Sequence, residues 1–209
     1  MLRANHPFCS DNVLNNGVVA PFDRGALVDR TPVLAIGSNR APEQLKRKFG
    51  PEALVPVQRC TLSGFDVVYA ARITNYGSVP ATLWPMAGAV SEVSITWLDE
   101  TQLRLMHLSE GVGDGYGYSR LKASNRITAE SGPSLAWVGA YIASRGVWFE
   151  GGEPLGLKAI SVLAGTASRT TTPAMLERLR KHCGCTLDLE EFVAKLSIDM
   201  TYRTSCRER

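Results

Sequence analysis

A Gly-Ser-Asn turn is the first place in this chain where residue types and spacing could do chemistry. Gly37, Ser38 and Asn39 follow the apolar run 33–36 and precede Pro42, which suits the first position of a helix. Glycine lets a ligand approach the backbone, and the first amides of a helix are unpaired and lie at its positive end. The turn could therefore bind a carboxylate or another anion. The alternative is an ordinary strand-to-helix turn, because cap residues of these types are common.

Glu110 is the second candidate. It stands where an apolar helical pattern gives way to the segment "EGVGDGYGY", which holds four glycines in nine residues. A carboxyl group at such a place could take a proton from a substrate and return it, and the glycines would leave room for that substrate. The alternative is a solvated residue at the end of a helix.

Several other residues were weighed as sites and have plainer explanations. His107 lies three residues before Glu110 and could share its helix face, although a packing role is the alternative. Asp114, among glycines, fits a turn. The "HCGC" segment at 182–185 has no second ligand cluster at zinc spacing. The tryptophans lie in or beside strand-like runs, which favours core positions.

Short strand-like runs dominate the first two thirds of the chain. Apolar or alternating runs bounded by turn residues predict strands at 31–36, 55–63, 65–71, 81–85, 92–98, 118–124 and 134–144. Few helices separate these runs, so regular βαβ alternation is not expected. The pattern favours a mixed α/β protein with a mixed sheet or a small β-barrel.

Helix signals occur at four places. A proline start and an apolar pair predict a short helix at 41–50, and Asp99 with Gln102 fits a capping box for a helix at 100–109. From Thr172 the chain is predicted to be helical, in the two segments 172–184 and 188–197. We expect an N-terminal extension at 1–30, a main domain at 31–165 and a helical extension at 166–209.

Composition excludes several classes of protein. The chain has 209 residues, of which 44% are hydrophobic and 21% charged, and its net charge is +3. A balance of this kind is typical of a globular protein, and so small a charge makes no case for nucleic acid. No apolar run reaches membrane-spanning length, and the first residues show no signal-peptide core. Five scattered cysteines fit reduced thiols. We therefore expect a cytoplasmic protein without nucleic-acid or membrane partners.

Three segments, taken in order, carry a resemblance to a known family. They are "AIGSNR", then "PATLWPMAGAVSEVSITWLDETQLRLMHL", then "SEGVGDGYGY", within Val33 to about Tyr118. In this order they resemble the γ-glutamylcyclotransferase-like family, whose fold is a small mixed β-barrel flanked by helices. The resemblance implies an enzyme of the cyclising C–N lyase or acyltransferase kind. In such an enzyme the α-amine of a γ-glutamyl amine or peptide attacks the γ-carbonyl and releases 5-oxoproline.

The resemblance also implies roles for particular residues. Glu110 would be the general acid/base, and no metal or organic cofactor would be needed. The substrate-binding positions would be Ile36, Gly37, Ser38, Asn39, Tyr116 and Tyr118.

Two departures from the family pattern keep other functions open. Ile36 stands where the family loop opens with tyrosine, and Arg40 stands where it closes with leucine. One alternative is a non-catalytic metabolite-binding module that keeps the loop. The other is a subunit of an assembly, with a protein partner bound through the terminal helices.

Overall fold

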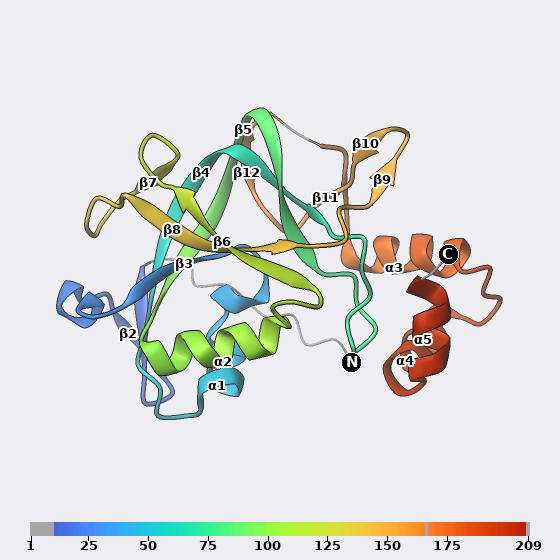
Figure 1. Ribbon diagram of the computed structural model, residues 1–209, viewed down its shortest axis with the longest axis horizontal. Helices are drawn as coiled ribbons and strands as arrows, with labels where there is room; N and C mark the ends of the chain where they lie inside the picture. Colours follow the sequence, from blue (N-terminus) through green and yellow to red (C-terminus); the bar gives the residue numbers. More distant parts are fainter. Residues whose placement is uncertain (1–10, 166, 208–209) are drawn as a thin grey trace.

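The computed structural model describes residues 11–165 and 167–207, and most of its strands belong to one sheet of eleven strands (Figure 1). The sheet consists of β1 Asn12–Asn15, β2 Val18–Pro21, β3 Thr31–Ala35, β4 Val55–Tyr69, β5 Ala81–Leu98, β6 Tyr116–Lys122, β7 Ile127–Ala129, β8 Trp137–Ala143, β11 Gly156–Leu157, β12 Val162–Ala164 and β13 Arg169–Thr170. A separate hairpin pairs β9 Phe149–Glu150 with β10 Glu153–Pro154.

Two long strands form the centre of the sheet. β4 and β5 pair antiparallel from Val57 opposite Thr96 to Tyr69 opposite Ala81. The sequence predicted four shorter strands here, and that division was wrong. Gly64, which suggested a break, has φ +80° and lies where the register shifts between Ser63 and Phe65. A β-bulge therefore absorbs the glycine, and the strand bends without ending.

The sheet is mixed but open. Its main path runs β13-β11-β4-β5-β3-β8-β6, with β1, β2, β7 and β12 attached at the side. The pairs β3–β8 and β11–β13 are parallel, and the other pairs are antiparallel. The predicted mixed α/β class is confirmed, whereas the predicted closure into a barrel is not found. Among the described residues β6 and β13 end the path, and no ladder joins one to the other.

Five α-helices cover parts of this sheet. They are α1 Pro42–Phe49, α2 Glu100–Glu110, α3 Thr172–His182, α4 Leu189–Ile198 and α5 Met200–Arg207, with short 3-10 turns η1 Arg24–Leu27 and η2 Ser38–Arg40. The predicted capping box of Asp99 and Gln102 is present at α2. The cap of α3 is Thr171, one residue earlier than the sequence suggested. Helix α5 was missed.

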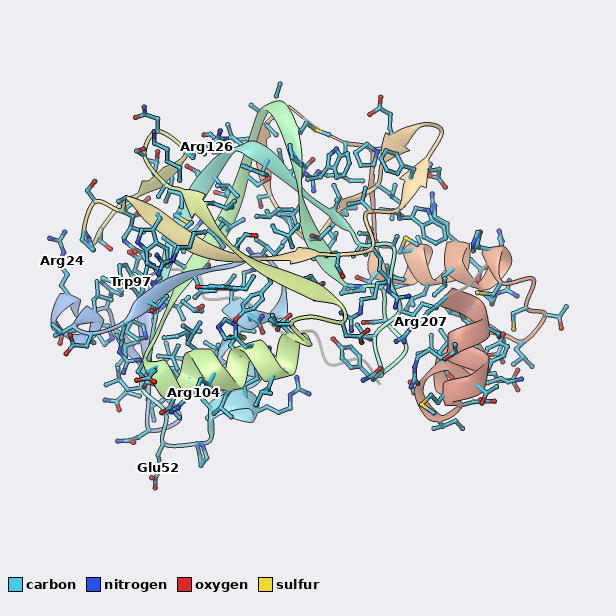
Figure 2. The ribbon with its side chains drawn as sticks, in the orientation of Figure 1. Arg24, Glu52, Trp97, Arg104, Arg126 and Arg207 are labelled. Carbon is cyan, nitrogen blue, oxygen red and sulfur yellow. The ribbon has the colours of Figure 1, made fainter. Side chains whose placement is uncertain are left out.

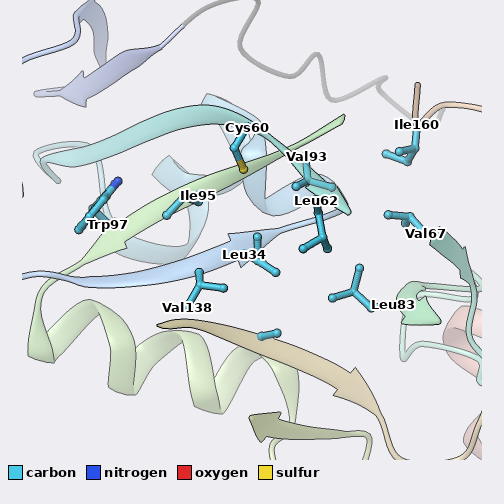
Figure 3. Close-up of a cluster of buried hydrophobic side chains, with 11 residues drawn as sticks. Leu34, Cys60, Leu62, Val67, Leu83, Val93, Ile95, Trp97, Val138 and Ile160 are labelled. Atoms are coloured by element: carbon cyan, nitrogen blue, oxygen red, sulfur yellow. The ribbon is translucent and has the colours of Figure 1, made fainter. Parts of the chain in front are cut away.

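The helices form two groups, and each packs on its own apolar cluster. Helices α1 and α2 lie side by side below the sheet in Figure 1 and share a cluster with Val33, Val57 and Tyr116. Helices α3, α4 and α5 gather at one end of the sheet, around Tyr69 and Phe192. A third cluster lies between the strands and includes Leu34, Ile95 and Val138 (Figure 3). The candidate residues lie beside the α1–α2 cluster.

A buried carboxylate near the end of β4 is paired with residues 167–169. Asp66 is fully buried and its Oδ2 accepts a hydrogen bond of 3.1 Å from the amide of Ala167. Its Oδ1 contacts Arg169 in an ion pair and accepts from the amide of Val67 at 2.6 Å. Ala167 and Arg169 lie about a hundred positions after Asp66, so this carboxylate is paired by a distant part of the chain.

The N-terminal residues that are described belong to the main sheet. β1 pairs with β2 and also with β4, where Val13 lies opposite Pro56. The proposed boundaries near residues 30 and 165 stay a prediction. Within 11–165 and 167–207, no helix is both long enough and apolar enough to cross a membrane.

Candidate functional site

The Gly-Ser-Asn turn connects β3 to α1. β3 ends at Ala35, η2 takes up Ser38 to Arg40, and the amide of Ala41 donates to the carbonyl oxygen of Ser38 at 2.9 Å. Gly37 has φ −131°, so its backbone lies outside the left-handed region. Ser38 is exposed, whereas Asn39 is half-buried. The turn is therefore a 3-10 turn followed by a proline-started helix.

Glu110 is the last residue of α2. Gly111 ends the helix in the left-handed conformation, with φ +63°, and its amide donates back to Leu108. The side chain of Glu110 is only 17% exposed, so it is not the solvated helix-end residue that was the alternative. Asn39 Nδ2 donates to Glu110 Oε1 at 2.9 Å. The fold thus brings together two candidate residues that lie 71 positions apart.

Lys48 is a part of the site that sequence reasoning missed. Its Nζ lies 2.5 Å from Glu110 Oε1 and 3.2 Å from Met106 Sδ, and its side chain is 10% exposed. Lys48 lies three positions after buried Leu45 in α1, so the two share a helix face. That spacing could have indicated that Lys48 is partly buried, because a residue on the apolar face of α1 points toward the part of the protein on which the helix packs.

The amide group of Asn39 has one unsatisfied atom. Its Oδ1 is buried and has no hydrogen-bond partner among the described residues. Rotating the amide by half a turn would place Oδ1 against the Glu110 carboxylate, which offers no proton when ionised. The orientation with Nδ2 toward Glu110 is therefore the favourable one, and a free acceptor remains beside it.

Tyr116 lies near Glu110 with its hydroxyl already bonded. The Tyr116 hydroxyl donates to the carbonyl oxygen of Ala81 at 2.7 Å, and the side chain is 7% exposed. Burial raises the pKa of Tyr116, the nearby Glu110 carboxylate raises it further, and Arg72 opposes both. Tyr116 therefore stays neutral, and its hydroxyl is already used by Ala81.

Tyr118 is on the same face of β6 but serves a different group of rings. Its ring meets His107 edge-on at 4.6 Å and lies 5.2 Å from the ring of Tyr141. It also covers Gly139, where an added Cβ would come 2.2 Å from the Tyr118 hydroxyl. Of the two predicted tyrosines, the structure thus places Tyr116 toward Glu110 and packs Tyr118 against its neighbours.

His107 and Tyr141 complete this aromatic group. The Tyr141 hydroxyl and His107 Nδ1 are 2.9 Å apart and share a hydrogen bond. Burial raises the pKa of Tyr141, and Tyr118 and the Glu110 carboxylate add to that rise. The sequence analysis missed Tyr141, because the alternating pattern of a strand does not predict which helix packs on that strand. His107 has the packing role that was its alternative.

The glycines after Glu110 do not leave the predicted room for a substrate at every position. A Cβ on Gly115 would lie 1.2 Å from Nη1 of Arg72. The space beside Gly115 is therefore filled by the Arg72 guanidinium, which also lies 5.4 Å from the centre of the Tyr116 ring. Asp114 is exposed and forms a 3.9 Å ion pair with Arg145.

The two positions that depart from the family pattern have structural explanations. Ile36 is half-buried and packs on the cluster between the strands. Arg40 points its guanidinium toward the carbonyl oxygens of Glu92 and Ala159, each at 3.5 Å, and burial lowers its pKa. Arg40 therefore adds no charge next to Glu110, whereas Ile36 supplies no hydroxyl there.

The part of the chain that is described holds no cluster of three or more His, Cys, Asp or Glu side chains that could bind a metal ion. No protein-family model and no curated protein matches the chain.

Several solved structures are similar to this chain at low identity. One is a γ-glutamyl cyclotransferase, with 14% identity, a TM-score of 0.47, and coverage of 86% of this chain and 99% of that one. A Homo sapiens protein described as uncharacterized has 14% identity, a TM-score of 0.48, and coverage of 81% and 88%. An Arabidopsis thaliana protein has 18% identity, a TM-score of 0.42, and coverage of 56% and 70%. Similarities of this size do not assign the chain to a family or an activity.

Proposed function

We propose that the site around Glu110 cyclises γ-glutamyl compounds, releasing 5-oxoproline and a free amine. The substrate is a small molecule in which an amine or a peptide is attached to the γ-carboxyl of glutamate. The proposal makes the chain an enzyme that needs no metal ion or organic cofactor for this step.

The hydrogen bond from Asn39 to Glu110 is the observation that carries the proposal. The family resemblance rests on three segments taken in order, and neither the Gly-Ser-Asn loop nor the segment that begins at Glu110 is specific by itself. In the fold they meet, because Asn39 Nδ2 lies 2.9 Å from Glu110 Oε1. A binding loop and an acid/base are useful to one substrate only when they are adjacent, and here they are.

The reaction transfers protons through Glu110. The substrate α-ammonium first loses one proton to solvent, and the resulting amine nitrogen attacks the γ-carbonyl carbon to close the ring. The Glu110 carboxylate accepts the second proton that this nitrogen must lose. Collapse of the tetrahedral intermediate breaks the original C–N bond, and the protonated Glu110 returns the proton to the leaving amine. Attack within one molecule needs mainly the correct orientation, so much of the acceleration comes from holding the reactive conformer.

The neighbours of Glu110 are suited to holding that conformer. Asn39 and Lys48 both contact Oε1, which leaves Oε2 for the substrate amine. Asn39 Oδ1, which has no partner among the described residues, can accept a second N–H of the same amine. The backbone amides of Gly37 and Ser38 would face the developing charge on the γ-carbonyl oxygen.

The test is release of 5-oxoproline from a panel of γ-glutamyl amines and γ-glutamyl dipeptides. Glu110→Gln should lower kcat by a factor of about 10²–10⁴, the range for a positioned acid/base. Glu100→Gln is the matched control, because Glu100 lies on the same helix with its side chain 87% exposed. Equal turnover by wild type and Glu110→Gln, with both folded, would refute the assignment of Glu110.

The Lys48 contact favours a second candidate function, a non-catalytic metabolite-binding module. A lysine 2.5 Å from Oε1 competes with a substrate ammonium for the carboxylate. Ile36 also leaves the loop without the family hydroxyl. Under this alternative, a γ-glutamyl compound binds wild type and Glu110→Gln equally well, and neither form releases 5-oxoproline.

A further inference from the structure

A cavity outside the Glu110 site is lined in part by Arg72. Its volume is about 370 Å³. It is bounded by residues 71–73 after β4, by residues 145–149 after β8, and by helices α3 and α5. Glu110 does not line it, so this cavity is separate from the site described above.

Positive charge dominates the described lining of this cavity. Arg72, Arg145 and Arg207 all line it, and Asp114 is the only carboxylate among the described lining residues. Burial lowers the pKa of Arg207, and repulsion from other arginines, Arg72 and Arg145 among them, adds to that effect. The single ion pair of Asp114 with Arg145 is long, at 3.9 Å, and largely exposed. The cavity therefore carries an excess of positive charge.

One nitrogen of the Arg72 guanidinium is left without a hydrogen-bond partner in the described part of the chain. This nitrogen, Nη1, is buried. The guanidinium is fixed between the backbone at Gly115 and the Tyr116 ring. A buried charged donor without an acceptor is costly, and in native proteins it calls for an explanation. Arg72 also lines the cavity, so an anionic ligand there would offset the charge of its guanidinium.

The rest of the lining is apolar. Val79, Val147 and Leu179 contribute aliphatic surface, and Trp148 and Phe149 contribute rings. Small-molecule sites have this composition, with a mostly apolar pocket and a few polar groups that fix orientation. Bare inorganic anions would leave this apolar wall without a contact.

We propose that the cavity binds a small organic carboxylate with an apolar or aromatic body, and that Arg72 is its main anchor. The planar guanidinium matches a carboxylate in two parallel hydrogen bonds. Arg145 and Arg207 add charge at the rim, and the body of the ligand packs beside Trp148. The proposal does not depend on turnover at Glu110.

The test uses 3-phenylpropionate as the probe and 3-phenylpropanamide as its uncharged counterpart. Calorimetry measures both affinities, and the indole N–H resonance of Trp148, assigned with Trp148→Phe, locates the binding. We expect the carboxylate to bind at least about tenfold more tightly than the amide, as one charge-assisted hydrogen bond implies. Equal binding of the two, no saturable binding of the carboxylate at millimolar concentration, or an unmoved Trp148 resonance would overturn the proposal.

Charge-changing variants test both the direction and the size of the expected change in carboxylate affinity. Arg72→Gln should weaken carboxylate binding at least about tenfold. Arg104→Gln makes the same change of charge on α2, where the side chain is 67% exposed and far from Arg207 (Figure 2), and should leave affinity unchanged. Asp114→Asn should strengthen binding about twofold to fivefold, the range of an exposed charge pair.

Arg145→Gln covers the case in which Arg72→Gln does not fold. The Arg145 side chain is 57% exposed, so its loss should not affect folding, and binding should weaken about threefold. Unchanged affinity in both Arg145→Gln and Asp114→Asn would contradict the placement of the carboxylate in this cavity.

Discussion

Replacing Lys48 by Met should destabilise the protein by leaving the Glu110 carboxylate with one side-chain donor in place of two. The two side chains are 10% and 17% exposed, and their charged atoms are 2.5 Å apart. Exposed pairs contribute about 0–1 kcal/mol, and breaking a fully buried pair costs about 3–5 kcal/mol. This pair lies between those limits, so we expect a loss of about 1–3 kcal/mol in the free energy of unfolding.

Urea unfolding at pH 7 measures this loss through the midpoint, provided that the m-value is unchanged. Lys181→Met is the matched control, because Lys181 is 72% exposed and lies 3.8 Å from Glu177. It should change stability by less than about 0.5 kcal/mol. The double variant Lys48→Met/Glu110→Gln should be more stable than the sum of the two losses predicts, because the unpaired charge is gone. If Lys48→Met is as stable as wild type, the contact contributes nothing and our account of the site is wrong.

Three further predictions test the packing described above. Asp66→Asn should lower the free energy of unfolding by about 2–4 kcal/mol, measured by thermal unfolding, because it leaves Arg169, whose side chain is 16% exposed, without its carboxylate partner. Gly115→Ala should cost about 1–3 kcal/mol, since the new methyl group meets Arg72, whereas Gly117→Ala, whose Cβ would lie 3.9 Å from its nearest neighbour, should cost less. Burial raises the pKa of Cys60 from 9.0 to about 12, so the unfolded chain ionises this thiol first and stability falls as the pH rises above 9. At pH 10 this one group removes about 1.4 kcal/mol, and the fall should be smaller by that amount in Cys60→Ala.

Each of these expectations can fail in its own way. If the Asp66→Asn protein has the same melting temperature as wild type, neutral hydrogen bonds can replace the ion pair. Equal losses in Gly115→Ala and Gly117→Ala would show that contact with Arg72 does not set the cost. Parallel stability curves for wild type and Cys60→Ala between pH 8 and pH 10 would contradict the raised pKa of that thiol.

Local signals in the sequence predicted the helices well and the long strands poorly. The capping box at Asp99 depends on residues three positions apart, and the structure reproduces it. The division of β4 at Gly64 failed because a bulge accommodates glycine only when a partner strand lies alongside. The sequence also did not predict that the sheet is open. Closure into a barrel depends on which edge strands pair with each other, and the sequence of a single strand does not contain that information.

The candidate site was only partly predictable. Glu110 and Asn39 were named from motif order, and their contact is a tertiary fact that no local pattern contains. Lys48 could have been suspected from its spacing to Leu45, but most lysines at such positions reach solvent. Nothing in the sequence predicted that Arg72 fills the space beside Gly115, because these two residues are about forty positions apart in the chain.

The pairing of Asp66 has a consequence for how the chain reaches its folded state during synthesis. Residues up to about 100 contain both long central strands, but Asp66 receives its arginine and one of its amides only from residues 167–169. A ribosome-bound chain that stops short of these residues would hold the Asp66 carboxylate near the end of β4 without its counter-ion, which disfavours burial of that carboxylate. The sheet should therefore be completed only after about four fifths of the chain has emerged from the ribosome. The docking of α1 and α2, which brings Asn39 to Glu110, should wait for the same step. Such long-range closure also predicts slow refolding.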